Sequence, residues 1–432
     1  MSQVTSLRRV VGLWGAIGMG LGSILGAGVF VSIGLAADIT GSSVVLAVAL
    51  AAIVATANGL SSAQLAAAHP VSGGTYEYGH RFIHPLAGFS AGWLFLVAKS
   101  ASAATAALGC AGYALHFFGV AQTTSLRVCV ALGLAGVLTL LVARGLKRSH
   151  QVNVAIVSCT LIALVSFVVC GWLSVTPEQV SSHFEVEAWP ALIDAPSGLL
   201  EATALMFVAY TGYGRIATLG EEVRDPAVTI PRAMIATLVV AMLIYISVSA
   251  TAVALVGAAR LAEATHAAGA PLEMIARLTA TPYLSVLVAL GAVSAMAGVL
   301  LNLLLGLSRV LLAMARRHEM PTPLAHIDSE TQSPTRAVWV MGLIVMGLTL
   351  LGDVKVTWSL SAFNVLVYYG LTNLAALRLP EEARRFPAWV SWLGLVSCFG
   401  LTFFVHKEIA LIGLAILGLG LTWRALMIRR GS

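Results

Sequence analysis

Two glycine-rich stretches interrupt apolar segments of the chain, and they could create binding groups from the backbone alone. GSILGAGVF covers Gly22 to Phe30, and FVAYTGYG covers Phe207 to Gly214. Each glycine inside a helix costs about 1 kcal/mol relative to alanine, so both stretches predict an interrupted helix. An interruption frees N–H groups, which suit a carboxylate, and carbonyl groups, which suit an ammonium. Two interruptions could therefore bind a zwitterion without a charged side chain.

Lys99 is the second chemical feature, because it lies in the middle of the apolar segment 86–118. A lysine at the centre of a membrane span costs about 2.5–3.5 kcal/mol on insertion scales, and such a residue is a functional candidate by default. We expect Lys99 to exchange a proton and so to act as a coupling residue. The structural alternatives are that it reaches the inner headgroups or pairs with a glutamate there.

The elements that carry these residues follow from the composition. Charged residues make up 10% of the 432 residues and apolar residues 59%, whereas a soluble protein is about a quarter charged. The chain is therefore predicted to be an all-α polytopic membrane protein without a soluble domain. A helical span needs about 20 apolar residues. By that rule we expect about twelve spans, at about 10–37, 41–68, 86–118, 125–144, 151–175, 198–222, 232–257, 281–316, 336–352, 357–378, 387–405 and 408–427.

Lysine and arginine residues are concentrated in alternate loops, and this bias predicts the orientation. Both termini are expected to be cytoplasmic, with the chain in the plasma (inner) membrane. The net charge of +6 reflects the same bias and does not indicate nucleic-acid binding. On the inner side, Arg215 follows the second interruption. We expect it to act in gating with Glu221 or Glu222, or else to be structural.

The two interruptions occupy matching places in the two halves of the chain. Because five spans separate them, and five is odd, the interrupted helices enter the membrane from opposite sides. This pattern predicts an inverted repeat of about 10–175 and 198–378 within one transmembrane domain, with extra helices at about 387–427. Interrupted helices at corresponding places indicate the binding site of a transporter. The alternative is that the glycines only let helices pack closely.

Four motifs resemble a known family. GSILGAGVF, PVSGGTYEYG (70–79), FVAYTGYGRIATLGEEVRDPAVTIPRA (207–233) and LSRVLLAMARRHEMP (307–321) are similar to conserved stretches of the amino acid–polyamine–organocation superfamily, in the same order. The resemblance implies a five-plus-five inverted fold and the transport of amino acids and related amines. Some relatives carry a lysine in span five, and the matching place here is Thr160 or Cys159.

The resemblance also implies a set of site residues. Backbone N–H groups would meet the amino acid carboxylate, and backbone carbonyls would meet the α-ammonium. The N–H groups are those of Gly26, Ala27 and Gly28, and the carbonyls are those of Ile24, Val208, Ala209 and Thr211. Ala103 is expected to face the side chain of the substrate.

The substrate class is suggested by what the spans lack. No acidic residue lies deep in spans one, three, six, eight or ten, which favours a neutral amino acid. The alternative is a cationic amino acid, a polyamine or another organic amine, since carbonyls and aromatic rings also bind cations. Span eight offers only Ser294 and Asn302 as polar partners for sodium. Coupling to protons, or plain exchange, is therefore favoured over sodium.

Other classes of protein receive less support. The sequence carries none of the short motifs of zinc hydrolases, serine hydrolases or ATPases, so an enzyme is not expected. The five cysteines lie within or beside spans and suggest neither disulfides nor a metal site. A channel of the same architecture would not need two matched interruptions. We expect a secondary active transporter that works by alternating access, with no cofactor, in contact with membrane lipid, an amino acid substrate and protons.

Overall fold

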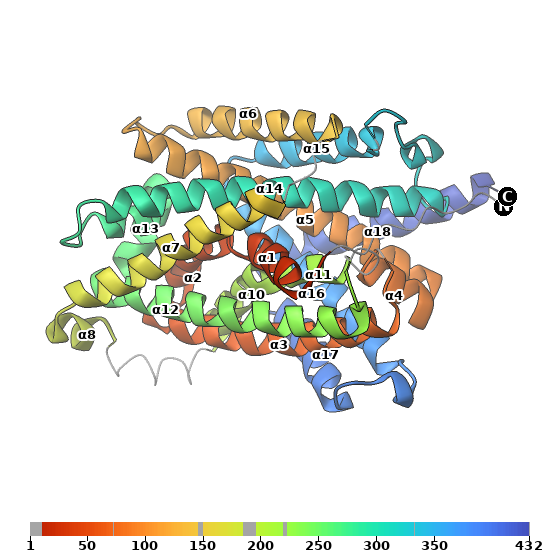
Figure 1. The fold of residues 1–432 in the computed structure, drawn as a ribbon, viewed down its shortest axis with the longest axis horizontal. Helices are drawn as coiled ribbons and strands as arrows, with labels where there is room; N and C mark the ends of the chain where they lie inside the picture. The colour runs from red at the N-terminus through yellow and green to blue at the C-terminus, as the bar shows by residue number, and fades with distance from the viewer. Residues whose placement is uncertain are drawn as a thin grey trace.

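The computed structural model of this chain describes residues 11–71, 73–145, 150–184, 196–218, 223–331 and 333–431. Within these ranges the regular elements are helices, and the one extended contact is an isolated bridge between Val11 and Val223. Long helices such as α3, α6, α12 and α14 run roughly along a common direction, so that the molecule is an elongated bundle (Figure 1). The architecture confirms the all-α polytopic fold.

Every expected span has a counterpart among the helices, and two spans are interrupted. In chain order they are α1, η1 and α2 (Leu13–Ile24, Gly28–Ser32 and Ile33–Thr40), α3 (Val44–Ala68), α5 (Pro85–Phe117), α6 (Thr124–Ala143), α7 (His150–Ser174), α10, η3 and α11 (Ser197–Tyr210, Thr211–Tyr213 and Gly214–Ala217), α12 (Pro226–Ala268), α14 (Leu284–Arg316), α15 (Thr335–Thr349), α16 (Val354–Leu377), α17 (Ala388–Thr402) and α18 (Lys407–Gly431). In the described chain, eight stretches are long and apolar enough to cross a membrane, and α15 and α17 are shorter apolar helices.

Short helices connect the long ones. They are η2 (Gly41–Ser43), α4 (Thr75–Phe82), α8 (Pro177–His183), α13 (Pro271–Ala276), η4 (Thr322–Ala325) and η5 (Glu381–Ala383). The expected seventh span, 232–257, lies within α12, which begins at Pro226 and continues to Ala268 but consists of two helices joined across a kink at Gly257, so that the expected end of the span coincides with the kink. It departs from helical geometry at Gly257, whose φ of 75° lies in the left-handed region that glycine tolerates.

The first interruption lies where the glycine pattern predicts it. Helix α1 ends at Ile24, and Leu25 has an extended backbone with a ψ of 103°. The chain then resumes as a π-helix, η1, before α2. The π-turn was not expected from the sequence. Such turns are rare and occur frequently at functional sites.

The second interruption also lies within its predicted stretch. Helix α10 ends at Tyr210, the tighter 3₁₀ turn η3 follows, and α11 begins at Gly214. Both halves of the chain therefore carry one broken helix, and the two breaks contain glycine at the points where the backbone leaves regular α-helix.

Helix α5 is the most deeply enclosed of the long helices. It packs against α14, α16, α4 and α6, and small residues cover the buried part of its surface. Ala98, Ala101, Ala104 and Ala107 have no exposed surface. Small side chains let neighbouring helices approach closely in a membrane, where apolar burial alone gives little driving force between helices. Lys99 is therefore carried by the central helix of the bundle.

Candidate functional site

The two interruptions are in direct contact with each other. A Cβ atom on Gly28 would lie 2.6 Å from the Cβ and 2.9 Å from the Cα of Ala209. In return, a Cβ on Gly212 would overlap the backbone of Ser23 and lie 2.6 Å from the backbone nitrogen of Ile24. Each break thus uses a glycine to approach the backbone of the other, which is a contact that no larger residue could make without moving a helix.

Tyr245 of α12 joins the two interruptions by hydrogen bonds. Its hydroxyl lies 2.8 Å from the carbonyl oxygen of Ile24 and 3.3 Å from that of Ala209. The side chain is fully buried. A carbonyl released by a helix break is costly in an apolar setting unless it accepts a hydrogen bond. Tyr245 therefore stabilises both breaks from a helix that belongs to neither.

The breaks also leave N–H groups without helical partners. Leu25 is the last residue of the first half to bond back, to the carbonyl of Leu21, and the N–H groups of Val29 and Phe30 then donate to the carbonyl of Gly26. The N–H groups of residues 26–28 fall within the interruption, at the start of the following helical segment. This is the geometry that favours a bound anion.

Lys99 reaches the second interruption. Its Nζ donates to Thr211 Oγ1 at 2.8 Å, and the Thr211 hydroxyl donates in turn to the carbonyl of Val208 at 2.7 Å. Because a hydroxyl has a single proton, Thr211 can only accept from Lys99. The Thr211 carbonyl accepts from the hydroxyl of Tyr369 at 3.2 Å. The lysine is 7% exposed, so its amino group is held inside the protein at the break.

A cavity of about 570 Å³ contains most of the predicted site. The predicted substrate-binding residues that line it are Ile24, Gly26, Ala27, Gly28, Val208, Ala209 and Thr211, together with Lys99 and Arg215. Ala103 is fully buried and does not line the cavity, whereas its neighbour Ser102 does. Glu221 and Glu222 lie outside the described residues. The cavity brings together residues from α1, α5, α10, α14 and α16.

The cavity extends from the breaks to an end of the molecule that is rich in arginine. Its lining there includes Glu77 of α4 and the arginines at the end of α14, Arg316 and Arg317. The opposite side of the first break is packed: the hydroxyl of Tyr113 donates to the carbonyl of Phe30 at 2.8 Å and accepts from the N–H of Leu272 at 3.3 Å. Of the residues that the structure describes, none in α13 lines the cavity. The cavity is therefore accessible from the arginine-rich end.

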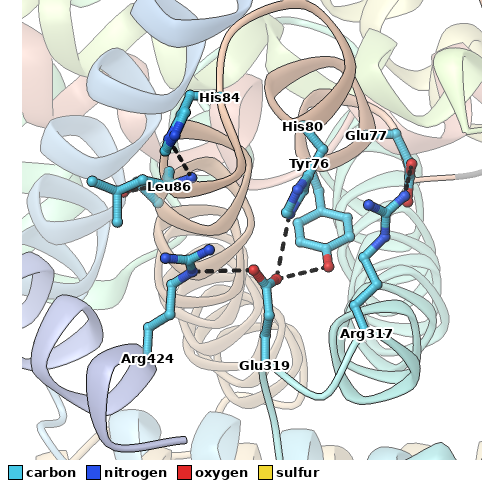
Figure 2. A network of polar contacts seen from close by, with 9 residues as sticks. Tyr76, Glu77, His80, His84, Leu86, Arg317, Glu319 and Arg424 are labelled. Atoms are coloured by element: carbon cyan, nitrogen blue, oxygen red, sulfur yellow. Dashed lines mark hydrogen bonds and ion pairs between the residues drawn. The ribbon is translucent and has the colours of Figure 1, made fainter. Parts of the chain in front are cut away.

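A polar network surrounds Glu319 beside that opening (Figure 2). Its carboxylate accepts from the hydroxyl of Tyr76 at 2.8 Å and from Nε of Arg424 at 3.2 Å, and Nε2 of His80 lies 3.4 Å away. Burial alone would raise the pKa of the Glu319 carboxyl, but the hydrogen bonds and charges of these partners outweigh it and hold the pKa below its usual value. The network joins α4, the loop after α14 and the C-terminal helix α18.

A second ion pair lies beside this network (Figure 2). Arg317 Nη2 is 2.6 Å from Glu77 Oε2, and the Arg317 guanidinium lies over the ring of Tyr76, 5.6 Å from its centroid. Burial and the neighbouring Glu319 carboxylate raise the pKa of the Tyr76 hydroxyl, which therefore stays protonated and remains a donor.

Asn302 of α14 contacts the first interruption at the position considered for sodium. Its Nδ2 lies 3.2 Å from the carbonyl oxygen of Gly22 and 3.3 Å from Ser23 Oγ. An amide N–H₂ group is a hydrogen-bond donor. Asn302 therefore occupies the two oxygen atoms that a bound cation would need as ligands. Thr160, at the place considered for a lysine in span five, donates to the carbonyl of Ile156 in its own helix.

Sequence reasoning did not find Tyr245, Tyr369 or Glu77 as neighbours of the site. Tyr245 and Tyr369, the latter next to Tyr368, are aromatic residues in apolar helices, where packing is the ordinary role. Glu77 lies in the stretch PVSGGTYEYG, whose pattern resembles a family motif but assigns no role to this carboxylate. No local pattern connects these residues to the two breaks.

The sequence profile of one family, described as "Amino acid permease", matches residues 15–429, which is nearly the whole chain. The chain belongs to the amino acid permease family. The resemblance inferred from the four motifs is thereby confirmed, and the expectation that the chain is not an enzyme agrees with a family of transporters.

Individual relatives agree with the family. An uncharacterized transporter of Mycobacterium tuberculosis is 38% identical over 96% of this chain and 90% of its own length. The branched-chain amino acid permease BcaP of Bacillus subtilis is 25% identical over 88% of this chain and 83% of its own. A vacuolar cationic amino acid transporter of Arabidopsis thaliana is 25% identical over 78% of this chain and 58% of its own. This permease is therefore a multi-pass membrane protein whose relatives have differing substrates, and the bacterial relatives indicate the plasma membrane.

Proposed function

We propose that this permease is a secondary active transporter of amino acids that works by alternating access. The observation that carries the proposal is the contact between the two helix breaks at one cavity. The α-carboxylate would bind the N–H groups of Gly26, Ala27 and Gly28, and the α-ammonium would bind the carbonyls of Ile24, Val208, Ala209 and Thr211. These backbone groups recognise the part that all α-amino acids share, and the rest of the cavity would discriminate among side chains.

The proposed substrates are amino acids whose side chains carry no positive charge, neutral amino acids being the class expected from the sequence. In the described lining of the cavity, the one carboxylate is Glu77, and Arg317 already binds it. A dibasic amino acid or a polyamine would bring a second positive charge to a site that already holds Lys99. Cationic substrates therefore have less support than neutral ones.

We further propose that the arginine-rich end faces the cytoplasm, as the distribution of lysine and arginine in the loops predicts. In that orientation both termini are cytoplasmic, and the cavity is open inward and closed outward by the contacts of Tyr113. The halves 10–175 and 198–378 would form the inverted repeat, with 387–427 outside it. Arg215, which lines the cavity, would take part in the inner gate with Glu221 or Glu222.

Lys99 is proposed as the coupling residue, and exchange of amino acids is the alternative mode. Its position at Thr211 supports this role, because a change in the protonation of Lys99 would directly alter the polar groups of the second break. Lys99→Ala should lose uptake driven by a pH gradient and keep some binding of the substrate. An unchanged pH profile of uptake would contradict coupling by Lys99.

The function as a whole is tested in proteoliposomes. Purified protein is reconstituted, and the uptake of each labelled amino acid is measured with and without the unlabelled amino acid inside. A carrier should show saturable uptake and counterflow. A channel would show neither property. The absence of uptake, counterflow and binding for every amino acid would contradict the proposed function.

A further inference from the structure

We propose that this site prefers amino acids with an acidic side chain, and that Lys99 binds the second carboxylate. The inference rests on the proposed function, because it assumes that the α-amino acid group occupies the two breaks. It goes beyond that function by naming a substrate class, and it extends the class beyond the neutral amino acids expected from the sequence.

The first step concerns the partners of Lys99. A lysine ammonium has three donors, and the structure assigns one of them to Thr211 Oγ1. The residue is 7% exposed, and within the described ranges no carboxylate forms an ion pair with it. A buried charge is costly when it has no counter-ion, whereas a hydrogen-bonded ion pair recovers much of the cost. Within the described residues Lys99 therefore lacks a negative partner, and a second carboxylate on the substrate would supply one.

The second step concerns the charge of the loaded site. A neutral amino acid would bring one carboxylate to the first break and one ammonium to the second break, where Lys99 is already bound to Thr211. Two ammonium groups would then face a single carboxylate. An acidic side chain adds the second carboxylate and balances the charges, whereas a basic side chain adds a third positive group. Inside the protein the effective dielectric constant is low, so these differences in net charge change the binding free energy more than they would in water.

The third step concerns the carbonyls that would bind ammonium groups. Side-chain donors already lie at all four: Ile24 and Ala209 share the one hydroxyl proton of Tyr245, Val208 accepts from Thr211, and Thr211 accepts from Tyr369. A carbonyl oxygen has two lone pairs, and both are in use at Val208 and Thr211, because the backbone N–H groups of Thr211 and Gly214 also donate to them. This supply suits one ammonium group better than two that lie side by side. A carboxylate between the substrate ammonium and Lys99 would satisfy both.

The fourth step concerns the route from the arginine-rich end. Besides Lys99, the cationic residues that line the cavity are Arg215, Arg309, Arg316 and Arg317. Glu77 is the one acidic residue in the described lining, and its carboxylate lies 2.6 Å from Arg317. An excess of one sign of charge along a cleft favours ligands of the opposite sign. The entrance and the deep end of the cavity therefore favour the same class of substrate.

Two pairs of nearly isosteric amino acids test the proposal: glutamate against glutamine, and aspartate against asparagine. Dissociation constants are measured at neutral pH on the purified full-length protein, by thermal stabilisation and by competition for uptake. We expect at least one acidic member to bind about tenfold more tightly than its amide, as a charge-assisted hydrogen bond to Lys99 would produce. Equal or tighter binding of both amides would overturn the proposal.

A variant then assigns the preference to Lys99. Lys99→Met keeps an unbranched chain of similar length and removes the charge, and it should reduce the ratio between acid and amide to about twofold or less. Lys407→Met is the matched control, because Lys407 is exposed at the start of α18, and it should keep the wild-type ratio. A preference that persists in Lys99→Met would overturn the role of Lys99. If that variant does not fold, the wild-type ratio still decides the preference.

The proposal and the underlying function fail in different ways. Binding and counterflow of neutral amino acids, without a preference for acids, would overturn the acidic class and leave the transporter function intact. That result would favour a neutral Lys99 amine in the loaded state. Absence of binding by every amino acid would overturn the proposed function and the inference with it.

Discussion

The hydroxyl of Tyr245 lies 2.8 Å from the carbonyl oxygen of Ile24, the residue at which the first broken helix stops. The same hydroxyl lies 3.3 Å from the carbonyl of Ala209 in the second broken helix. A side chain from α12 thus holds two breaks that are far apart in sequence. A movement that separates the breaks must change at least one of these hydrogen bonds.

Removal of that hydroxyl should weaken the site and the fold together. Tyr245→Phe keeps the ring and removes the one hydroxyl proton that the two buried carbonyls share, which costs about 1–3 kcal/mol. We expect a lower Tm of the purified protein and slower uptake. Tyr283→Phe is the control, since Tyr283 is 80% exposed and its loss of a hydroxyl should change neither. An unchanged Tm and uptake in Tyr245→Phe would mean that the hydroxyl does not stabilise the breaks.

The contact at Gly212 should not tolerate one added methyl group. A Cβ there meets the backbone of Ser23 and Ile24, which cannot turn aside as a flexible side chain can. Overpacking of this kind typically costs about 1–3 kcal/mol, so Gly212→Ala should lower the Tm and the rate of uptake. Gly347→Ala is the matched control, because a Cβ added at Gly347 would have no neighbouring atom within 4 Å beyond the backbone of its own helix, and it should leave the Tm and the rate of uptake unchanged. Wild-type behaviour of Gly212→Ala would contradict the close approach.

Gly28 tests the proposed carboxylate site more directly. Gly28→Val would push against Ala209, 2.6 Å from the added Cβ, and would obstruct the N–H groups of the first break. We expect loss of substrate binding and uptake while the amount of protein in the membrane fraction stays near that of the wild type. Gly133→Val, at a position with no atom within 4 Å of the added Cβ, should retain uptake. Normal uptake by Gly28→Val would remove the first break from the binding site.

Acid should weaken the network at the arginine-rich end. The pKa of the Glu319 carboxyl is lowered from 4.5 in the folded protein. The stabilisation is therefore present above pH 4.5 and is lost as the pH falls through the lower folded-state value. Glu319→Gln should lower the Tm at neutral pH and make the Tm less sensitive to acid below about pH 4.5. Glu382→Gln is the control, because Glu382 is exposed, and its Tm should depend on pH as the wild-type Tm does. The same dependence in Glu319→Gln would mean that the network contributes nothing to stability.

Sodium should have no effect on uptake or on thermal stability. The amide nitrogen of Asn302 lies against the Gly22 carbonyl and Ser23 Oγ, so a cation there would meet a donor instead of an oxygen ligand. Uptake is measured in sodium chloride and in choline chloride at equal ionic strength. Equal rates are expected, and a strict requirement for sodium would contradict the interpretation of Asn302.

The positions of the spans and of both breaks were predictable from the sequence, because they depend on local properties. The length of an apolar segment determines whether a helix can cross the membrane. Glycines clustered within about one or two turns determine where that helix is least stable. The expected interruptions at 22–30 and 207–214 therefore agree with the ends of α1 and α10, at Ile24 and Tyr210. Motif order was also sufficient to identify the family.

The assembly of the site was decided only by the tertiary structure. Helix α5 is apolar or small on nearly every side around Lys99, so no periodic pattern shows which residues face the cavity, and Ser102 lines it where Ala103 was expected. The hydrogen bonds from Lys99 to Thr211 and from Tyr245 to Ile24 join residues separated by 112 and 221 positions. Such pairs depend on how whole helices rotate and cross in the bundle. Packing of many side chains at once sets that arrangement, and no single stretch of sequence encodes it.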